Sequence, residues 1–123
     1  MEKDPLTAAV IGAAIEVHRL LGPGLLESVY QKCLCHELKL REFAFEPQVK
    51  LPIVYKGMEL DAEFVMDILV PGRLVVELKA VERMHPVHEA QLITYLKLSG
   101  IHVGLLINFN VPVLKDGIKR LVV

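Results

Sequence analysis

The stretch that decides the fold of this chain is residues 58–80, MELDAEFVMDILVPGRLVVELKA. Its first part, 58–70, alternates between two faces with apolar side chains on one of them, which predicts a strand. Proline and glycine at positions 71 and 72 predict a tight turn, and the mainly apolar stretch 74–80 predicts a second strand. The stretch is therefore expected to be an antiparallel hairpin.

The register of this hairpin follows from the length of its loop. If residues 71–73 form the loop, every pair on one face is apolar: Val70 with Leu74, Ile68 with Val76, Met66 with Leu78, and Phe64 with Ala80. A loop one residue shorter would set Met66 against Glu77 and mix charge into that face. The longer loop is expected, and it places Asp67 directly opposite Glu77.

Two facing carboxylates repel each other unless something intervenes. Lys79 shares the face of Glu77 and supplies one positive charge, and a divalent cation would supply more. Hard oxygen ligands suit Mg²⁺ or Mn²⁺, which lowers the pKa of a bound water and stabilises charge on a phosphoryl oxygen. Asp67, Glu77 and Lys79 thus fit phosphodiester hydrolysis, although charges on a strand face are more often a solvated ion cluster.

Two helices are expected before the hairpin. The first has Asp4 as N-cap and Pro5 at its first position, and it ends at Gly22-Pro23-Gly24. The second covers 25–39, where three apolar residues lie at helical spacing from Glu27: Tyr30, Leu34 and Leu38. Glu27 is therefore expected within an apolar stripe, where a carboxylate needs a partner or a cation. The alternative is a first-turn acid that the helix dipole favours.

The rest of the chain completes an α/β order. A strand near a sheet edge is expected over 49–55, a helix over 87–99 that packs on the acidic face of the hairpin, a buried strand over 102–107 and a short helix over 115–121. A hairpin followed by a helical crossover predicts a mixed four-stranded sheet with helices on both sides. Residues 1–123 are expected to form a single domain.

Composition narrows the class of protein. Apolar residues make up 53% of the chain, yet no apolar run is long enough to cross a bilayer, and the first residues lack the pattern of a signal peptide. We expect a cytoplasmic protein without membrane contact, with Cys33 and Cys35 as reduced packing residues, and the apolar content makes a homodimer plausible. Fourteen basic and fifteen acidic residues give no general attraction to nucleic acid, so any such contact must be local.

Asp67 followed by Glu77-Leu78-Lys79 resembles the motif of the PD-(D/E)XK nuclease superfamily. Residues 24–30, GLLESVY, resemble the signature of the GxxExxY proteins, a bacterial and archaeal family within that superfamily. Further similar stretches cover most of the chain: 12–18, 76–82, 86–96 and 104–110. The resemblance implies a restriction-endonuclease-like core with a leading helix, a hairpin, a crossover helix and a further strand.

The resemblance also implies roles for five residues. Asp67 and Glu77 would ligate Mg²⁺ or Mn²⁺, and Glu27 would complete the acidic site as a third ligand. Lys79 would serve the attacking water or the transition state, and Gln91 would orient groups from the crossover helix. Together these residues would form the catalytic site of a magnesium-dependent nuclease.

Auxiliary residues and one departure complete the prediction. His88 shares the face of Gln91 and is expected to approach the acidic site as a hydrogen-bond donor. Tyr30 and Tyr95 could reach a phosphate, although buried tyrosines with one satisfied hydroxyl are commoner. Met66 stands where the superfamily name has proline and where we expect arginine in GxxExxY proteins, so any phosphate contact of that arginine is lost.

Two functions from different classes follow. The first is a metal-dependent nuclease that cuts DNA or RNA, which the complete acidic set favours. The second is a non-catalytic nuclease-fold domain that binds a protein or nucleic-acid partner, which the balanced charge and the missing arginine favour.

Overall fold

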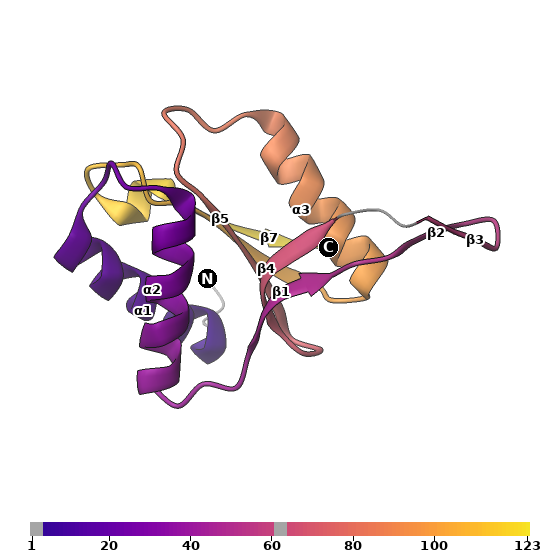
Figure 1. Cartoon of the computed structure of the whole chain (residues 1–123), viewed down its shortest axis with the longest axis horizontal. Coiled ribbons are helices and arrows are strands. Elements are labelled where there is room, and N and C mark those ends of the chain that lie inside the picture. The colour runs from indigo at the N-terminus through magenta and orange to yellow at the C-terminus, as the bar shows by residue number, and fades with distance from the viewer. Residues whose placement is uncertain (1–3, 61–63) are drawn as a thin grey trace.

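The computed structural model describes residues 4–60 and 64–123. Its main sheet has five strands in the order β1-β4-β5-β6-β7. Their bounds are β1 Glu46–Lys50, β4 Val65–Val70, β5 Leu74–Lys79, β6 Val103–Asn108 and β7 Ile118–Val122. β5 and β6 run parallel and the other neighbours run antiparallel, which makes the mixed α/β sheet that the element order predicts (Figure 1).

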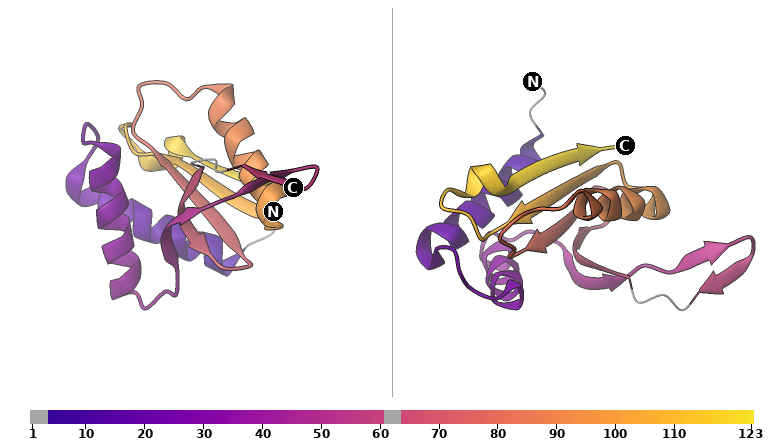
Figure 2. Two further views of the ribbon diagram at one scale, coloured as in Figure 1. Left: turned by 45° about the vertical axis from the view of Figure 1, so that its right-hand side comes forward. Right: turned by 90° about the horizontal axis from the view of Figure 1, so that it is seen from above.

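Helices cover both faces of this sheet. α1 (Pro5–Leu21) and α2 (Glu27–Leu40) lie on one side, and α3 (Pro86–Ser99) lies on the other (Figures 1 and 2). Each face has its own apolar cluster. The larger cluster joins α1 and α2 to inward side chains of β4, β5 and β6, and the smaller one packs α3 on the opposite side chains of the same strands. The buried strand predicted over 102–107 is confirmed by β6.

The ends of α1 follow their local signals. Asp4 is the N-cap and accepts a hydrogen bond from the Leu6 N–H at 3.1 Å, with Pro5 at the first position. Gly22 ends the helix with a φ of 70°, a conformation that glycine adopts without strain. Both predicted boundaries of this helix are confirmed. No helix in the described ranges 4–60 and 64–123 is long and apolar enough to cross a membrane.

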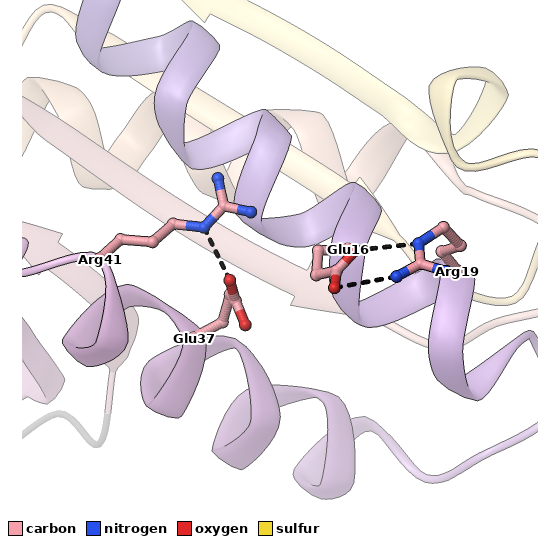
Figure 3. Close-up of polar contacts among 4 residues, drawn as sticks. All are labelled: Glu16, Arg19, Glu37 and Arg41. Atoms are coloured by element: carbon pink, nitrogen blue, oxygen red, sulfur yellow. Dashed lines mark hydrogen bonds and ion pairs between the residues drawn. The ribbon is translucent and has the colours of Figure 1, made fainter.

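Figure 3 shows two arginine–glutamate pairs, one along α1 and one at the end of α2 on the side that faces α1. Arg19 pairs with Glu16 at 2.9 Å, and Arg41 pairs with Glu37 at 2.7 Å. Such exposed pairs contribute little to stability, because water and salt screen them. The Arg41 guanidinium lies 3.5 Å from the position that a Cβ on Gly12 of α1 would take, an ordinary contact distance.

The hairpin register is confirmed next to the turn and wrong further out. Val70 pairs with Leu74 and Ile68 with Val76, as the loop over 71–73 requires. Met66, however, packs on the α3 side of the sheet, whereas its predicted partner Leu78 packs on the α1–α2 side. Phe64 and Ala80 are separated in the same way, with Phe64 against Tyr95 of α3. The alternation is interrupted at Asp67, where side-chain hydrogen bonds replace the backbone ladder.

The strands predicted over 49–55 and 58–70 are each divided. Residues 49–50 end β1 at the edge of the main sheet, while β2 (Ile53–Tyr55) and β3 (Met58–Leu60) pair in a separate ribbon that projects from the body (Figure 2). Pro52 lies between β1 and β2 and cannot donate to a ladder. The part of the predicted strand at Asp61, Ala62 and Glu63 lies outside the described residues.

The helix predicted over 115–121 is wrong. A single 3₁₀ turn, η1 (Leu114–Gly117), leads into β7, which pairs antiparallel with β6. Backbone donors and acceptors at the open edge of β6 are satisfied by this pairing, which outweighs the weak local preference for a helix. The extra strand is why the sheet has five strands and not the predicted four.

A Gly117→Ala substitution tests how tightly η1 closes against β6. A Cβ at this position would overlap the carbonyl oxygen of Asn108, a backbone atom that cannot rotate away. We expect the free energy of unfolding, measured by urea titration, to fall by about 1–3 kcal/mol. Gly12→Ala is the control, because it meets only a flexible arginine and gains helix propensity of about 0.8 kcal/mol. Equal stability of the two variants would contradict this account of the turn.

Candidate active site

Asp67 and Glu77 lie where the β4–β5 ladder gives way to side-chain contacts. The N–H of Asp67 donates to Oε2 of Glu77 at 3.2 Å, and the N–H of Leu78 donates to Oδ2 of Asp67 at 2.8 Å. Each carboxyl group therefore holds the backbone of the opposite strand. This arrangement keeps the two predicted ligands side by side at the point where the strands separate.

Glu77 is buried, with only 5% of its surface exposed. Burial raises the pKa of its carboxyl to about 10, and a hydrogen bond to Asp67 and the charge of Asp67 act in the same direction. The backbone of Asp67 and the charge of Lys79 oppose this shift but do not outweigh it. Without a cation, the Asp67–Glu77 pair therefore holds a proton at neutral pH. This proton removes the repulsion predicted between two facing carboxylates.

Two glutamines that the sequence reasoning missed hold Asp67 from neighbouring elements. Nε2 of Gln31 in α2 donates to the backbone carbonyl of Asp67 at 2.8 Å, and Nε2 of Gln48 in β1 approaches Oδ1 of Asp67 at 3.4 Å. Gln48 has a φ of 51°, unusual for a residue other than glycine. Gln31 lies one helical turn after Glu27, and that spacing could have identified it.

Glu27 is not buried in an apolar stripe. It is the first residue of α2 and is exposed, the position described by the first-turn alternative, although Tyr30, Leu34 and Leu38 of the predicted stripe are buried. Glu27 nevertheless lines a hollow of about 670 Å³ together with Asp67. Partial burial raises the pKa of the Glu27 carboxyl, Lys79 lowers it and Asp67 raises it again. Lys79 and Asp67 are thus close enough to Glu27 for their charges to act on its carboxyl.

A second hollow of about 590 Å³, under α3, is lined by Lys79, His88, Gln91 and Tyr95. The expectation that this helix packs on the acidic face is confirmed for the side of β5 that carries Glu77 and Lys79, but Asp67 lines the hollow beside α2 instead. Burial raises the pKa of Tyr95 to about 12, and the charges of Glu77 and Asp67 add to the shift. His88 accepts a hydrogen bond from the His85 N–H through Nδ1 at 3.2 Å. Partial burial, followed by the charges of Lys79 and His85, lowers the pKa of His88.

Tyr30 is placed away from these hollows. Its ring is fully buried and stacks on Phe109 with the ring centroids 4.5 Å apart. Its hydroxyl donates to the carbonyl of Gly22 at 2.5 Å and accepts from the Leu25 N–H at 3.2 Å. The packing alternative therefore describes Tyr30, which closes the turn between α1 and α2.

Asn108 is a buried polar residue that sequence reasoning also missed. Its Oδ1 accepts from the Val81 N–H at 3.1 Å, and its Nδ2 donates to the Val81 carbonyl at 2.9 Å. Asn108 also pairs with Lys79 across β5 and β6. The amide thus anchors the chain just after Lys79 and restricts where that side chain can lie.

An Asn108→Ala substitution removes both hydrogen bonds to Val81 and leaves a partly buried backbone N–H and carbonyl without these partners. We expect the free energy of unfolding to fall by about 1–3 kcal/mol, measured by urea titration. Asn110→Ala is the matched control, because Asn110 donates to Asn108 through its backbone N–H, which the substitution keeps. A stability loss of similar size in both variants would show that Asn108 has no special anchoring role.

The acidic pair can be tested for its fit to a divalent cation. Within residues 4–60 and 64–123, no three His, Cys, Asp or Glu side chains form a group that could hold a metal ion. Mg²⁺, however, is usually bound through one or two carboxylates, with waters and substrate oxygens as its other ligands. Oε1 of Gln31, in the hollow of Asp67, is buried without a hydrogen-bond partner and is free to accept from a water. Asp67 and Glu77 therefore fit a hydrated Mg²⁺, while Glu27 as third ligand stays a prediction.

Comparison with known proteins agrees with this geometry. Residues 4–121 match the family model described as the PD-(D/E)XK nuclease superfamily. No curated protein and no solved structure matches the chain. The family match covers both strands that carry Asp67, Glu77 and Lys79 and both helices that flank them. The chain belongs to the PD-(D/E)XK nuclease superfamily.

Proposed function

We propose that this protein is a metal-dependent nuclease that hydrolyses phosphodiester bonds in nucleic acid. The observation that carries the proposal is the buried Glu77 held against Asp67 at the separating ends of two strands, with Lys79 two residues further on. A buried carboxyl beside a second carboxyl is unfavourable for stability even when each accepts a backbone hydrogen bond, so the arrangement supports a functional role.

Each residue has a distinct part in the proposed reaction. Asp67 and Glu77 would hold Mg²⁺ or Mn²⁺, which supplies positive charge next to the phosphate and favours ionisation of water. Lys79 would stabilise negative charge that develops on the phosphate or orient the attacking water. Gln91 and His88 line the same hollow as Lys79 and would orient substrate oxygens, and Glu27 would complete the acidic site.

Finer assignments belong to the same proposal. The signature at 24–30 supports membership of the GxxExxY family within the superfamily. A single domain over 1–123, a cytoplasmic location and a homodimer remain predictions, and gel filtration with light scattering tests the last. The balanced charge of the chain supports local contact with nucleic acid rather than binding over the whole surface.

The deciding experiment is calorimetric titration of Mg²⁺ and Mn²⁺ into the wild type and Glu77→Gln, followed by cleavage assays on DNA and RNA. We expect saturable binding and cleavage by the wild type and loss of both in the variant, because glutamine keeps the size of the side chain but not its charge. Glu82→Gln, at an exposed position five residues away, is the control and should behave like wild type.

Absence of both metal binding and cleavage in the wild type, with oligonucleotide present, would contradict the proposal. The alternative of a non-catalytic nuclease-fold domain would then hold, and its protein or nucleic-acid partner would have to be sought. Binding of metal without cleavage of any substrate would leave the metal site in place and refute the nuclease reaction.

A further inference from the structure

The hollow next to Asp67 has a basic wall formed by α2. Lys32, His36 and Lys39 line it, and their spacing of four and three residues places them on one face of the helix. All three are exposed. In the described part of the chain, no ion pair involves Lys32 or Lys39. We call these three residues the basic edge, and its positive charge is available to a phosphate backbone.

The hollow under α3 has a different character. Its wall is mainly apolar and includes Phe64, Val87, Tyr95 and Leu98, with Lys79 as its lysine. The rings of Phe64 and Tyr95 meet edge to face with their centroids 6.1 Å apart. Tyr95 is buried, whereas Phe64 keeps 37% of its surface exposed. Phe64 therefore offers part of an aromatic surface in the same hollow as Lys79, the lysine of the proposed catalytic site.

The two hollows border different residues of the proposed catalytic site. The first includes Asp67 and the second includes Lys79, and no residue lines both. α2 and α3, which form their outer walls, lie on opposite sides of the sheet (Figure 1). A strand that placed one phosphate at Asp67 and Glu77 would meet basic side chains in one direction and an apolar wall in the other.

We infer that the substrate is single-stranded nucleic acid, with its backbone along the basic edge and one base against Phe64 on the other side of the cut phosphate. This inference rests on the proposed nuclease function and names its substrate class. A duplex presents two backbones and keeps its bases stacked, so it would leave the apolar hollow empty. A single strand can fill both hollows, because its phosphates and its unstacked bases are accessible together.

The charge distribution supports the same choice. The chain has a net charge of −1, so attraction to a polyanion must come from a local group of cations. The basic edge lies on one face of one helix, so it can contact the phosphates of one strand. Stacking on an aromatic side chain is tolerant of base identity, so the inference applies to DNA and RNA strands alike.

The test measures binding of fluorescein-labelled 12-mers by anisotropy, with single-stranded DNA, single-stranded RNA and blunt duplex DNA as probes. Glu77→Gln serves as background so that cleavage does not interfere. We expect both single strands to bind more tightly than the duplex. Adding Lys32→Gln and Lys39→Gln should weaken single-strand binding at least about fivefold and reduce the slope of log K against log salt by about 1.4. Arg73→Gln with Lys115→Gln removes the same charge from exposed positions outside both hollows and should change neither quantity.

The apolar hollow is tested separately with Phe64→Ala and Phe64→Leu. The loss of one stacked base should weaken single-strand binding by about fivefold or more in the alanine variant, while leaving duplex binding unchanged. Leucine keeps apolar volume but not the ring, so it separates stacking from packing and should bind nearly as weakly as alanine. Thermal melting of each variant confirms that it is folded, since Phe64 is partly exposed.

Duplex binding as tight as single-strand binding, or equal effects of the basic-edge and control pairs, would overturn the inference. Failure of the inference is distinguishable from failure of the proposed function. If the wild type cleaves nucleic acid but these variants bind normally, the nuclease proposal stands and the substrate path is wrong. If single strands bind as expected but the wild type never cleaves them, the path stands and the catalytic proposal is wrong.

Discussion

A Lys79→Met variant is expected to bind Mg²⁺ like the wild type and to cleave at least about 100-fold more slowly. Methionine is similar in length and fills the same space, but it cannot stabilise the charge that develops on the phosphate. Lys79 is half-buried at the end of β5, so water cannot readily take over the electrostatic role of its amine. Single-turnover cleavage at saturating metal measures the effect, because it reports the chemical step rather than product release.

The control is Lys115→Met, an exposed lysine in η1 outside both hollows. It should cleave at the wild-type rate. A Lys79→Met variant that cleaves normally would remove Lys79 from the reaction, and one that no longer binds metal would show that it acts through the site's structure instead.

The second large effect is on stability as a function of pH in the absence of metal. Burial, with Asp67 beside it, raises the pKa of Glu77 from 4.5 to about 10 in the folded protein. The folded state thus keeps a proton that the unfolded state releases. The contribution of this group to the free energy of unfolding therefore falls as pH rises. The contribution of Glu77 to wild-type stability is expected to be greatest below about pH 4.5 and to fall steadily toward about pH 10. At pH 7 the loss is on the order of 3 kcal/mol.

Glu77→Gln should abolish most of this dependence, because glutamine has no proton to lose and its amide can still donate to Asp67. In EDTA, urea titrations between pH 5 and pH 9 are expected to show a falling free energy of unfolding for the wild type and a much flatter line for the variant. Glu82→Gln should follow the wild type. A wild-type line as flat as the Glu77→Gln line would show that Glu77 ionises normally in the folded protein.

Addition of Mg²⁺ links this stability effect to the proposed site. A cation that replaces the shared proton should raise the melting temperature of the wild type most at high pH, where the unoccupied pair is least favourable. The Glu77→Gln variant should gain little. Equal gains in both proteins would place the metal elsewhere.

Local patterns in the sequence were enough for much of the fold. The N-cap at Asp4, the glycine that ends α1, and the hairpin loop at 71–73 all depend on residues within a few positions of one another. The crossover helix and the buried strand β6 follow from apolar periodicity and length. The superfamily motif at Asp67, Glu77 and Lys79 could be predicted for the same reason, since one hairpin carries all three residues.

Other features were decided only by contacts between distant segments. The side-chain alternation expected through Met66 fails because Asp67 and Glu77 hold the opposite backbones in place of ladder bonds. Residues 118–122 have no strong local preference, and they become β7 because β6 offers an open edge. Tyr30 could not be assigned from its spacing alone, since its hydroxyl partner lies eight residues away across a turn.

The site shows the same division. Gln31 reaches Asp67 across 36 positions and Asn108 reaches Val81 across 27, so neither contact has a local signature, even though the helical spacing of Gln31 from Glu27 could have pointed to that residue. The sequence by itself determined the α/β class, the hairpin and the residues that carry the chemistry, because these depend on short-range periodicity. Only the tertiary structure decided which side each residue faces, how deeply Glu77 is buried and which hollow lies beside it, because burial and electrostatics depend on everything that packs around a group.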